Sequence, residues 1–439
     1  MTRRTRRIVF YILVALFVVV GTGAVLYAEG LRLDFASLKL KKVGGIYVRA
    51  FPQGASIALD GTPIRNQSNF LTHGTLISNL FPKSYTLSLT LPGYDAWQER
   101  ADVEPSLVVE MKYAVLVPNT GTAVATSGDV TDFFAVGNER VETRESGAIV
   151  WRGAAVATGT VMSRSSDFKT MVYRTAAGRY MLFDFTTGTS ADLTALFEKK
   201  HVAAGAIRSI IVNPKNDTGG LALTGSRVWS VDFAGLSVTP IATSSPQDSI
   251  APTLAASQSE SAWSEIETAS DTSRISVYDN FSGLVIGRVE VPGATQTLGW
   301  LSDSSLGILQ TNGSLYIYDL PTQALRSIAS DVKSFYPSPD GTLVAALERS
   351  SLEIFDFADD DYYRFNLPDM ATIQGLAWYK DENHLFITYP DRIAFFDLAD
   401  TSLMNVTPVA HGTDPLYDPQ ENALYVVQGG NVKRFTFPS

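Results

Sequence analysis

A repeat of about 40 residues constrains the fold of this chain more than any other feature. Each copy is an apolar run of strand length that ends in Asp, and successive Asp residues are 48, 47, 40, 37 and 41 positions apart. Such a period is typical of four-stranded propeller blades, whereas helical repeats of similar length place apolar residues every 3.6 positions. The sequence therefore predicts an all-β chain dominated by a β-propeller. The repeated residues are Asp184, Asp232, Asp279, Asp319, Asp356 and Asp397.

A second element recurs ahead of the Asp-terminated runs and completes the expected blade. Residues 334–341 read Ser-Phe-Tyr-Pro-Ser-Pro-Asp-Gly before an apolar run, and residues 375–382 repeat this order of strand, turn and strand. The Ser-Pro-Asp-Gly turn at 338–341 resembles that of WD40-like, TolB-type propeller repeats, and the resemblance covers residues 113–439. It implies eight four-stranded blades if the degenerate copy at 148–151 is counted, and seven if it is not.

The repeat pattern also predicts how the blades turn and how the ring closes. A carboxylate just past a strand accepts hydrogen bonds from backbone N–H groups two residues on, so each repeated Asp is expected to fix a turn rather than bind a ligand. The last repeat, 431–435, stops one strand short of a blade. Because open sheet edges invite misassociation, an early strand from Tyr113 to Val117 is predicted to complete the final blade.

The N-terminal residues predict one membrane-spanning helix. Residues 8–27 contain no charged side chain, and 20 residues at helical rise reach about 30 Å, the thickness of a bilayer hydrocarbon core. Four arginines among residues 1–7 precede this run and Glu29 is the first charge after it. The positive-inside rule therefore places residues 1–7 in the cytoplasm and the bulk of the chain outside it. A cleaved signal peptide is the alternative, but its apolar region is roughly 7 to 15 residues long, so an uncleaved anchor in the plasma membrane is predicted.

Between this helix and the propeller, the sequence predicts a stalk and a small domain. Residues 31–42 alternate apolar and polar positions, so residues 28–43 are predicted to form a short hairpin or extended stalk. Residues 44–112 contain strand-like runs and an Asp60-Gly61 turn signal, and they resemble the PEGA domain, a small β-sandwich named for its Pro-Glu-Gly-Ala turn. The resemblance implies a β-sandwich that has no catalytic residues. Its turn residues in this chain are Pro52, Gln53, Gly54 and Ala55.

Charge and cysteine content exclude several classes of function. The formal net charge is -10, and because residues 1–27 hold four arginines and no acid, the remaining chain carries -14. An acidic chain of this kind argues against nucleic acid as a partner. The chain has no cysteine, which removes disulfides, thiolate metal sites, cysteine nucleophiles and a lipidated cysteine. Exported eukaryotic domains of this size more often carry disulfides, so a prokaryotic envelope protein is favoured.

Motifs of catalysis are missing from the sequence. It lacks Gly-x-Ser-x-Gly, His-Glu-x-x-His, Gly-x-x-x-x-Gly-Lys and a Gly-x-Gly-x-x-Gly after a strand. The four histidines are far apart, in or beside predicted turns, and each is expected to be a surface residue. We therefore predict no catalytic residue, no cofactor, no metal site and no enzymatic activity. The histidines are His73, His201, His384 and His411.

These features together predict a membrane-anchored, extracytoplasmic binding or scaffold protein of the cell envelope. Loops on a rigid scaffold are where binding residues concentrate, and a propeller presents a wide face of loops. The expected partner is an envelope protein, or a cell-wall or surface polymer. Two alternatives stay open at this point: a propeller hydrolase or lyase that acts on envelope glycans, and an accessory subunit of a membrane complex.

Overall fold

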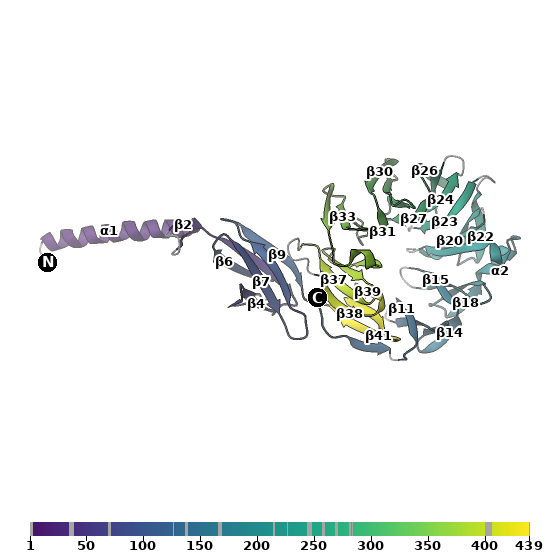
Figure 1. Cartoon of the computed structure of the whole chain (residues 1–439), viewed down its shortest axis with the longest axis horizontal. Coiled ribbons are helices and arrows are strands. Elements are labelled where there is room, and N and C mark those ends of the chain that lie inside the picture. Colours follow the sequence, from purple (N-terminus) through teal and green to yellow (C-terminus); the bar gives the residue numbers. More distant parts are fainter. Residues whose placement is uncertain are drawn as a thin grey trace.

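The computed structural model contains an N-terminal helix, a small β-sandwich and a β-propeller, in that order along the chain (Figure 1). The all-β fold with one N-terminal apolar helix confirms the predicted fold class. The structure describes residues 3–34, 39–68, 72–125, 127–136, 139–165, 169–213, 216–225, 227–243, 248–256, 260–267, 271–280, 282, 284–399 and 406–438.

The N-terminal helix, α1 (Arg3–Ala28), has 26 residues, and the mean hydropathy of its most apolar stretch is 2.7. It is long and apolar enough to cross a membrane. None of its described side chains is buried: Phe17 is 78% exposed and Val19 is 70% exposed. A helix of this kind serves as a membrane anchor or as a signal sequence.

A hairpin and a β-sandwich follow α1. The predicted stalk is a hairpin, because β1 and β2 pair with each other in a two-stranded sheet. The sandwich consists of a three-stranded sheet in the order β6-β3-β9 and a four-stranded sheet in the order β5-β4-β7-β8. The strands are β1 (Leu31–Asp34), β2 (Lys39–Lys42), β3 (Gly44–Phe51), β4 (Ser56–Leu59), β5 (Thr62–Ile64), β6 (Thr75–Leu80), β7 (Ser84–Thr90), β8 (Trp97–Asp102) and β9 (Val108–Val115).

Alternating side chains of the sandwich strands form its core, as period-two strands require. Ile46 and Val48 of β3 are buried against Leu87 and Leu89 of β7. The predicted turn at 52–55 joins β3 of one sheet to β4 of the other. The predicted Asp-Gly turn connects β4 to β5, and both of its residues have positive φ, 47° for Asp60 and 76° for Gly61. These angles are those of the type I′ turn that suits a two-residue hairpin.

Strand β9 joins the sandwich to the propeller. It runs parallel to β3 and passes through the predicted domain boundary between residues 112 and 113. Beyond β9, the Leu116 N–H donates to the Phe51 carbonyl. Val115 and Val117 then enter a hydrophobic cluster of the propeller that contains Phe395 and Phe437. The segment from Tyr113 to Val117 therefore belongs to the sandwich and its contact with the propeller.

The propeller is built from four-stranded antiparallel sheets, and in all but the last sheet the strands follow one another along the chain. Within the described residues there are eight such sheets in this part, and the degenerate copy at 148–151 lies in a sheet of its own. First strands of neighbouring sheets contact each other, as β15 with β19, β19 with β23 and β23 with β27 do, and we call the first strands inner strands.

The strands of the propeller, grouped by sheet, are as follows: β11 (Val130–Val136), β12 (Glu139–Arg144), β13 (Ala148–Trp151) and β14 (Ala154–Thr158); β15 (Thr160–Arg164), β16 (Thr170–Arg174), β17 (Tyr180–Asp184) and β18 (Thr189–Asp192); β19 (Ile207–Asn213), β20 (Asn216–Thr224), β21 (Arg227–Asp232) and β22 (Ser237–Thr243); β23 (Asp248–Ala256), β24 (Glu260–Glu267), β25 (Thr272–Asp279) and β26 (Leu284–Pro292); β27 (Thr295–Trp300), β28 (Ser305–Gln310), β29 (Leu315–Asp319) and β30 (Ala324–Ala329); β31 (Val332–Pro337), β32 (Leu343–Glu348), β33 (Leu352–Asp356) and β34 (Asp361–Phe365); β35 (Gly375–Trp378), β36 (His384–Thr388), β37 (Arg392–Asp397) and β38 (Val406–His411); β39 (Thr413–Asp418), β40 (Ala423–Gln428), β41 (Asn431–Thr436) and β10 (Thr122–Ala125).

An early strand closes the ring, but it is a different strand from the one predicted. The last sheet has the order β10-β41-β40-β39, and Thr122 and Ala123 of β10 pair with Arg434 and Lys433 of β41. The prediction that Tyr113 to Val117 closes the ring was wrong, because that segment is already paired within the sandwich. The open edge of the last sheet does take an early strand as its partner, and that strand is β10, a few residues later in the chain.

A substitution at Gly121, just before β10, can test whether β10 closes the ring. A Cβ at Gly121 would lie 2.7 Å from the ring of Phe435, which is buried in β41. We expect Gly121→Ala to push β10 away from β41 and to lower the free energy of unfolding by about 1 to 3 kcal/mol, as overpacking of a core does. Urea unfolding of the purified protein measures this change.

Gly205→Ala is the matched control, because a Cβ there meets no atom within 4 Å and Gly205 has no positive φ. A glycine to alanine change at such a site is neutral or stabilises by about 0.4 to 1 kcal/mol. Equal stability of the two variants would contradict the packing of residues 121–125 against the last strand.

Candidate functional site

The six repeated Asp residues each end the third strand of a sheet, and each carboxylate accepts a hydrogen bond from a backbone N–H in the turn that follows. In three turns the donor N–H belongs to the residue two positions after the Asp, and in the other three turns it belongs to the residue three positions after it. These contacts give each Asp a turn-fixing role. The N···O distances are 2.7 Å from Thr186 to Asp184, 2.9 Å from Ala358 to Asp356 and from Ala399 to Asp397, 3.0 Å from Gly235 to Asp232, 3.2 Å from Ser282 to Asp279 and 3.1 Å from Thr322 to Asp319.

These carboxylates share one face of the propeller with the ends of the inner strands. Neighbouring strands in every sheet are antiparallel, so the first and third strands run in the same direction and end at the same edge. We call this face, at the carboxyl ends of the first and third strands, the turn face. It carries the repeated Asp residues toward its periphery and the turns that follow the inner strands around its centre.

A hollow of about 540 Å³ lies at the centre of the turn face, where the inner strands of five sheets end. Most of its wall is apolar. The wall also includes serines and the charged residues Arg164 and Asp303. Residues that line it include Arg164, Val212, Ala256, Trp300, Asp303 and Pro339. Because they come from β15, β19, β23 and β27 and from the turns after β27 and β31, they lie far apart in the sequence.

An aromatic groove of about 340 Å³ adjoins this hollow. Its wall includes Tyr336, Trp378 and Tyr417, from the inner strands β31, β35 and β39. The Trp378 indole N–H donates to the Tyr336 carbonyl at 3.0 Å and so links two neighbouring sheets. Pro337 and Pro339 line both the groove and the hollow, so the two form one depression.

The charged side chains that line this depression are Arg164, Asp303 and Lys380, and Asp340 lies in the turn beside it. Asp303 is exposed at the edge of the hollow, and Lys380 is exposed at the edge of the groove. Asp340 accepts from the Thr342 backbone N–H at 2.8 Å and from the Ser338 hydroxyl at 2.7 Å. The backbone hydrogen bond from Thr342 is the main cause that lowers the pKa of Asp340 to about 2. This carboxylate therefore stays ionised well below neutral pH.

Arg164 is the cation within the hollow. Its guanidinium lies 4.8 Å from the ring of Phe134, in the inner strand of the preceding sheet. Burial lowers the pKa of Arg164, and the charge of Asp132 opposes this shift. A cation on an aromatic face contributes about 0.5 to 2 kcal/mol. The contact holds the two inner strands together at the hollow.

His384 is a buried ion-pair partner rather than the expected surface residue, so that prediction was wrong. Its side chain is 1% exposed, and its ring stacks on Phe395 at 4.7 Å. Nδ1 lies 2.9 Å from an Asp381 carboxylate oxygen, and Nε2 lies 3.6 Å from Asp397. Burial lowers the pKa of His384, but the hydrogen bonds and charges of Asp381 and Asp397 outweigh it and raise the pKa to about 9. The other histidines, His73, His201 and His411, are exposed.

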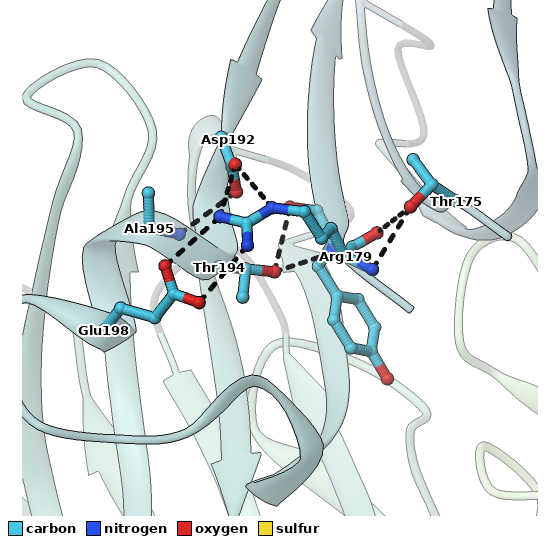
Figure 2. A network of polar contacts seen from close by, with 7 residues as sticks. Thr175, Arg179, Asp192, Thr194, Ala195 and Glu198 are labelled. Carbon is cyan, nitrogen blue, oxygen red and sulfur yellow. Dashed lines mark hydrogen bonds and ion pairs between the residues drawn. The ribbon is translucent and has the colours of Figure 1, made fainter. Parts of the chain in front are cut away.

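A second polar cluster lies at the opposite face and fixes one connection between sheets (Figure 2). Helix α2 (Leu193–Glu198) lies between β18 and β19, and the Asp192 side chain caps it by accepting from the Ala195 N–H at 3.0 Å. The Arg179 guanidinium donates to Asp192 at 2.8 Å and to Glu198 at 3.2 and 3.3 Å. Every charge of this cluster is paired, which indicates a structural role.

Metal-binding geometry does not occur in the described part of the chain: there is no group of three or more His, Asp or Glu side chains arranged to hold an ion. The depression on the turn face is largely apolar and aromatic, and its charged lining residues are Arg164, Asp303 and Lys380. Sequence reasoning missed it, because its residues come from many separate repeats. The one signal that pointed to it was the Ser-Pro-Asp-Gly turn at 338–341, which lies at its edge.

Comparison with known proteins identifies the fold. No protein-family model matches the chain, and no curated protein matches it, so the resemblances to the PEGA and TolB-type families stay predictions. The computationally designed Ika8 protein is similar in structure, with 13% identity, 72% of this chain and 98% of that chain covered, and a TM-score of 0.50. An oligogalacturonate lyase in complex with manganese covers 72% of this chain and 99% of its own, with 12% identity and a TM-score of 0.47. The lyase from Vibrio parahaemolyticus has 11% identity, a TM-score of 0.46 and coverages of 72% and 98%.

These comparisons correct one prediction. The sequence analysis predicted that the chain is not an enzyme, and this was wrong as an inference from missing motifs, because two of the similar structures are oligogalacturonate lyases. Their identity of 11% to 12% is weak, and the likeness assigns no lyase activity to this chain.

The buried His384 leads to a prediction about pH. Its pKa is raised in the folded protein, so the stabilisation is fully present below about pH 6.5 and is lost as the pH rises through about 9. The shift corresponds to a contribution on the order of 3 kcal/mol. We expect His384→Gln to lower the free energy of unfolding at pH 6, and we expect the difference from the parent to shrink toward pH 10. Urea unfolding at pH 6, 8 and 10 measures it.

His201→Gln is the matched control, since His201 is exposed. This variant should follow the parent at every pH. A difference between parent and His384→Gln that stays constant from pH 6 to pH 10 would contradict a charged His384 between two carboxylates.

Proposed function

We propose that this protein is a membrane-anchored, extracytoplasmic binding protein of the cell envelope, and that its turn face recognises a basic segment of another envelope protein. The observation that carries the proposal is the series of repeated Asp carboxylates in the turns of the turn face, around a largely apolar hollow. Helix α1 provides the anchor, and the sandwich places the propeller at a distance from the membrane. The turn face supports the binding function, and α1 and the sandwich support the proposed location of the propeller outside the membrane.

Anchoring is supported by the exposure of α1. Most of its apolar side chains are exposed and none is buried, and an exposed apolar helix of 26 residues is stable only in another apolar environment. The arginines among residues 1–7 favour a cytoplasmic N-terminus. The sandwich and propeller are then on the other side of the membrane.

Recognition of a basic segment is supported by charge and by shape. The carboxylates of the turn face create a negative potential that attracts lysine and arginine side chains and repels anionic polymers. The low pKa of Asp340 keeps this potential in place at mildly acidic pH. The hollow of about 540 Å³ has an apolar wall that accepts an apolar side chain of the same segment. A polymer of neutral sugars that stacks on the aromatic groove is the competing ligand.

Topology can be tested by cysteine labelling, because the chain has no cysteine of its own. We expect Gln420→Cys, exposed on the turn face, to react with a membrane-impermeant maleimide on intact spheroplasts. Thr5→Cys, on the cytoplasmic side in our proposal, should react only after detergent is added. Protection of Gln420→Cys, or labelling of Thr5→Cys without detergent, would overturn the proposed topology.

Photo-crosslinking in cells tests the binding face. Pro339 lines both the hollow and the aromatic groove. We expect a photoreactive amino acid at this position to form a covalent adduct with a protein. Asn312 is exposed in the turn between β28 and β29, on the opposite face, and a photoreactive group there should form no such adduct. Crosslinking yield is read on gels and the partner is identified by mass spectrometry.

Charge reversal at the hollow should weaken this adduct. We expect Asp303→Lys to reduce the crosslinking yield from position 339 because it repels a basic segment. Asp391→Lys, an exposed acid on the opposite face, should leave the yield unchanged. An adduct with a glycan, or a yield that both variants leave intact, would contradict recognition of a basic protein segment.

A further inference from the structure

We propose that the hairpin of β1 and β2 binds anionic phospholipid headgroups of the leaflet in which α1 ends. The inference rests on the membrane anchoring of the proposed function and adds a second contact with the same membrane. It would fix the orientation of the sandwich and propeller relative to the bilayer.

The register of the hairpin places its leucines on one face and three of its four basic residues on the other. Leu33 pairs with Leu40, and Arg32 pairs with Lys41. Residues directly opposite each other lie on the same face of a sheet, and alternate residues lie on opposite faces. Leu31, Leu33 and Leu40 therefore share one face with Lys42, and Arg32, Lys39 and Lys41 share the other.

The face with the leucines has little cover from the described part of the chain. Leu33 is 43% exposed and Leu40 is 52% exposed, and all four residues of β2 are exposed. The hairpin forms a two-stranded sheet of its own, and an isolated two-stranded hairpin is at best marginally stable in water. A surface that receives the two leucines would stabilise it.

Contacts with α1 place the hairpin where the membrane interface must be. The Arg32 guanidinium lies 3.6 Å from the centre of the Tyr27 ring and donates to the Tyr27 carbonyl at 3.0 Å. It also donates to the Asn79 side chain of the sandwich at 2.6 Å. The Val43 N–H, just after β2, donates to the Gly30 carbonyl at 3.0 Å. Figure 1 shows β2 at this junction between α1 and the sandwich.

The charge of the hairpin is opposite to that of the domains beyond it. Residues 31–42 contain four basic residues and one acid, in a chain whose net charge is -10. The basic residues are Arg32, Lys39, Lys41 and Lys42. Lysines next to a membrane bind anionic headgroups with about 1 kcal/mol each, which is roughly a fivefold gain in partitioning per residue. Leucines between them enter the boundary of the acyl chains.

These observations favour a lipid over another protein as the occupant. The anchor fixes the hairpin next to the bilayer at a high effective concentration, whereas a protein partner would have to approach the same narrow space. An amphipathic element with lysines on its polar side is typical of an interfacial membrane contact.

Fluorescence quenching on the full-length protein tests the inference. Leu40→Cys carries an environment-sensitive dye, and the protein is reconstituted in vesicles of phosphatidylcholine with or without phosphatidylglycerol and with a brominated lipid as quencher. We expect the dye at position 40 to be quenched, and more strongly in the anionic vesicles. The same dye on Thr90→Cys, exposed at the end of β7 remote from α1, should not be quenched.

Two double variants test whether the lysines of the hairpin matter, rather than the loss of any two positive charges. Lys39→Gln with Lys42→Gln should lower the ratio of inserted to solvated hairpin by roughly 25-fold, at about fivefold per lysine. Lys199→Gln with Lys200→Gln removes two exposed lysines after α2 and should change nothing. Hydrogen exchange of residues 31–42, which needs no dye, should be slower in anionic vesicles for the parent and for the Lys199/Lys200 control, but not for the Lys39/Lys42 variant.

The outcomes distinguish this inference from the proposed anchoring. Protein that floats with the vesicles while the dye at position 40 stays unquenched would overturn the inference and leave the anchor intact. Quenching that is equal in neutral and anionic vesicles would overturn the headgroup contact. Protein that does not float with vesicles would overturn the anchor itself, and the inference with it.

Discussion

The pairing of β10 with β41 is the contact on which the rest of the propeller depends. A propeller buries its sheets against one another in a ring, and a ring with one incomplete sheet has an open edge of unpaired backbone groups. β10 precedes the whole repeat array and β41 ends it, so their pairing links the two ends of the array. Closure brings the inner strands together at their carboxyl ends, and the hollow exists only because they meet there.

Much of the fold was predictable from local chemistry. The Asp-terminated runs become third strands, because a carboxylate after a strand has a local backbone partner within three residues. The Asp60-Gly61 turn was equally predictable, since both residues tolerate positive φ. The position of the closing strand was not, because 113–117 and 122–125 are both short apolar runs and only the sandwich partner of the first distinguishes them. His384 was also missed, since the two carboxylates that keep it charged while buried belong to a turn and to the next strand.

The candidate site is a property of the assembled ring rather than of any motif. Arg164, Trp300 and Tyr417 come from three sheets and more than 250 residues of chain, so no spacing in the sequence connects them. The sequence does indicate negative charge on the turn face. An Asp ends the third strand in repeat after repeat, because its carboxylate fixes the turn that follows. A structural requirement at each turn therefore also produces the negative potential on which the proposed recognition of a basic segment depends.

Disulfide trapping tests the closure of the ring most directly, because the chain has no cysteine of its own. Ala123 and Lys433 are register partners, and opposite residues of antiparallel strands have Cα atoms about 4.5 to 5.5 Å apart, within the range of a disulfide. The account predicts that Ala123→Cys with Lys433→Cys forms an intramolecular disulfide in the full chain, seen as a mobility shift on a non-reducing gel. Tyr113→Cys with Lys433→Cys should form none. A disulfide in the second pair, or its absence in the first, would contradict closure by β10.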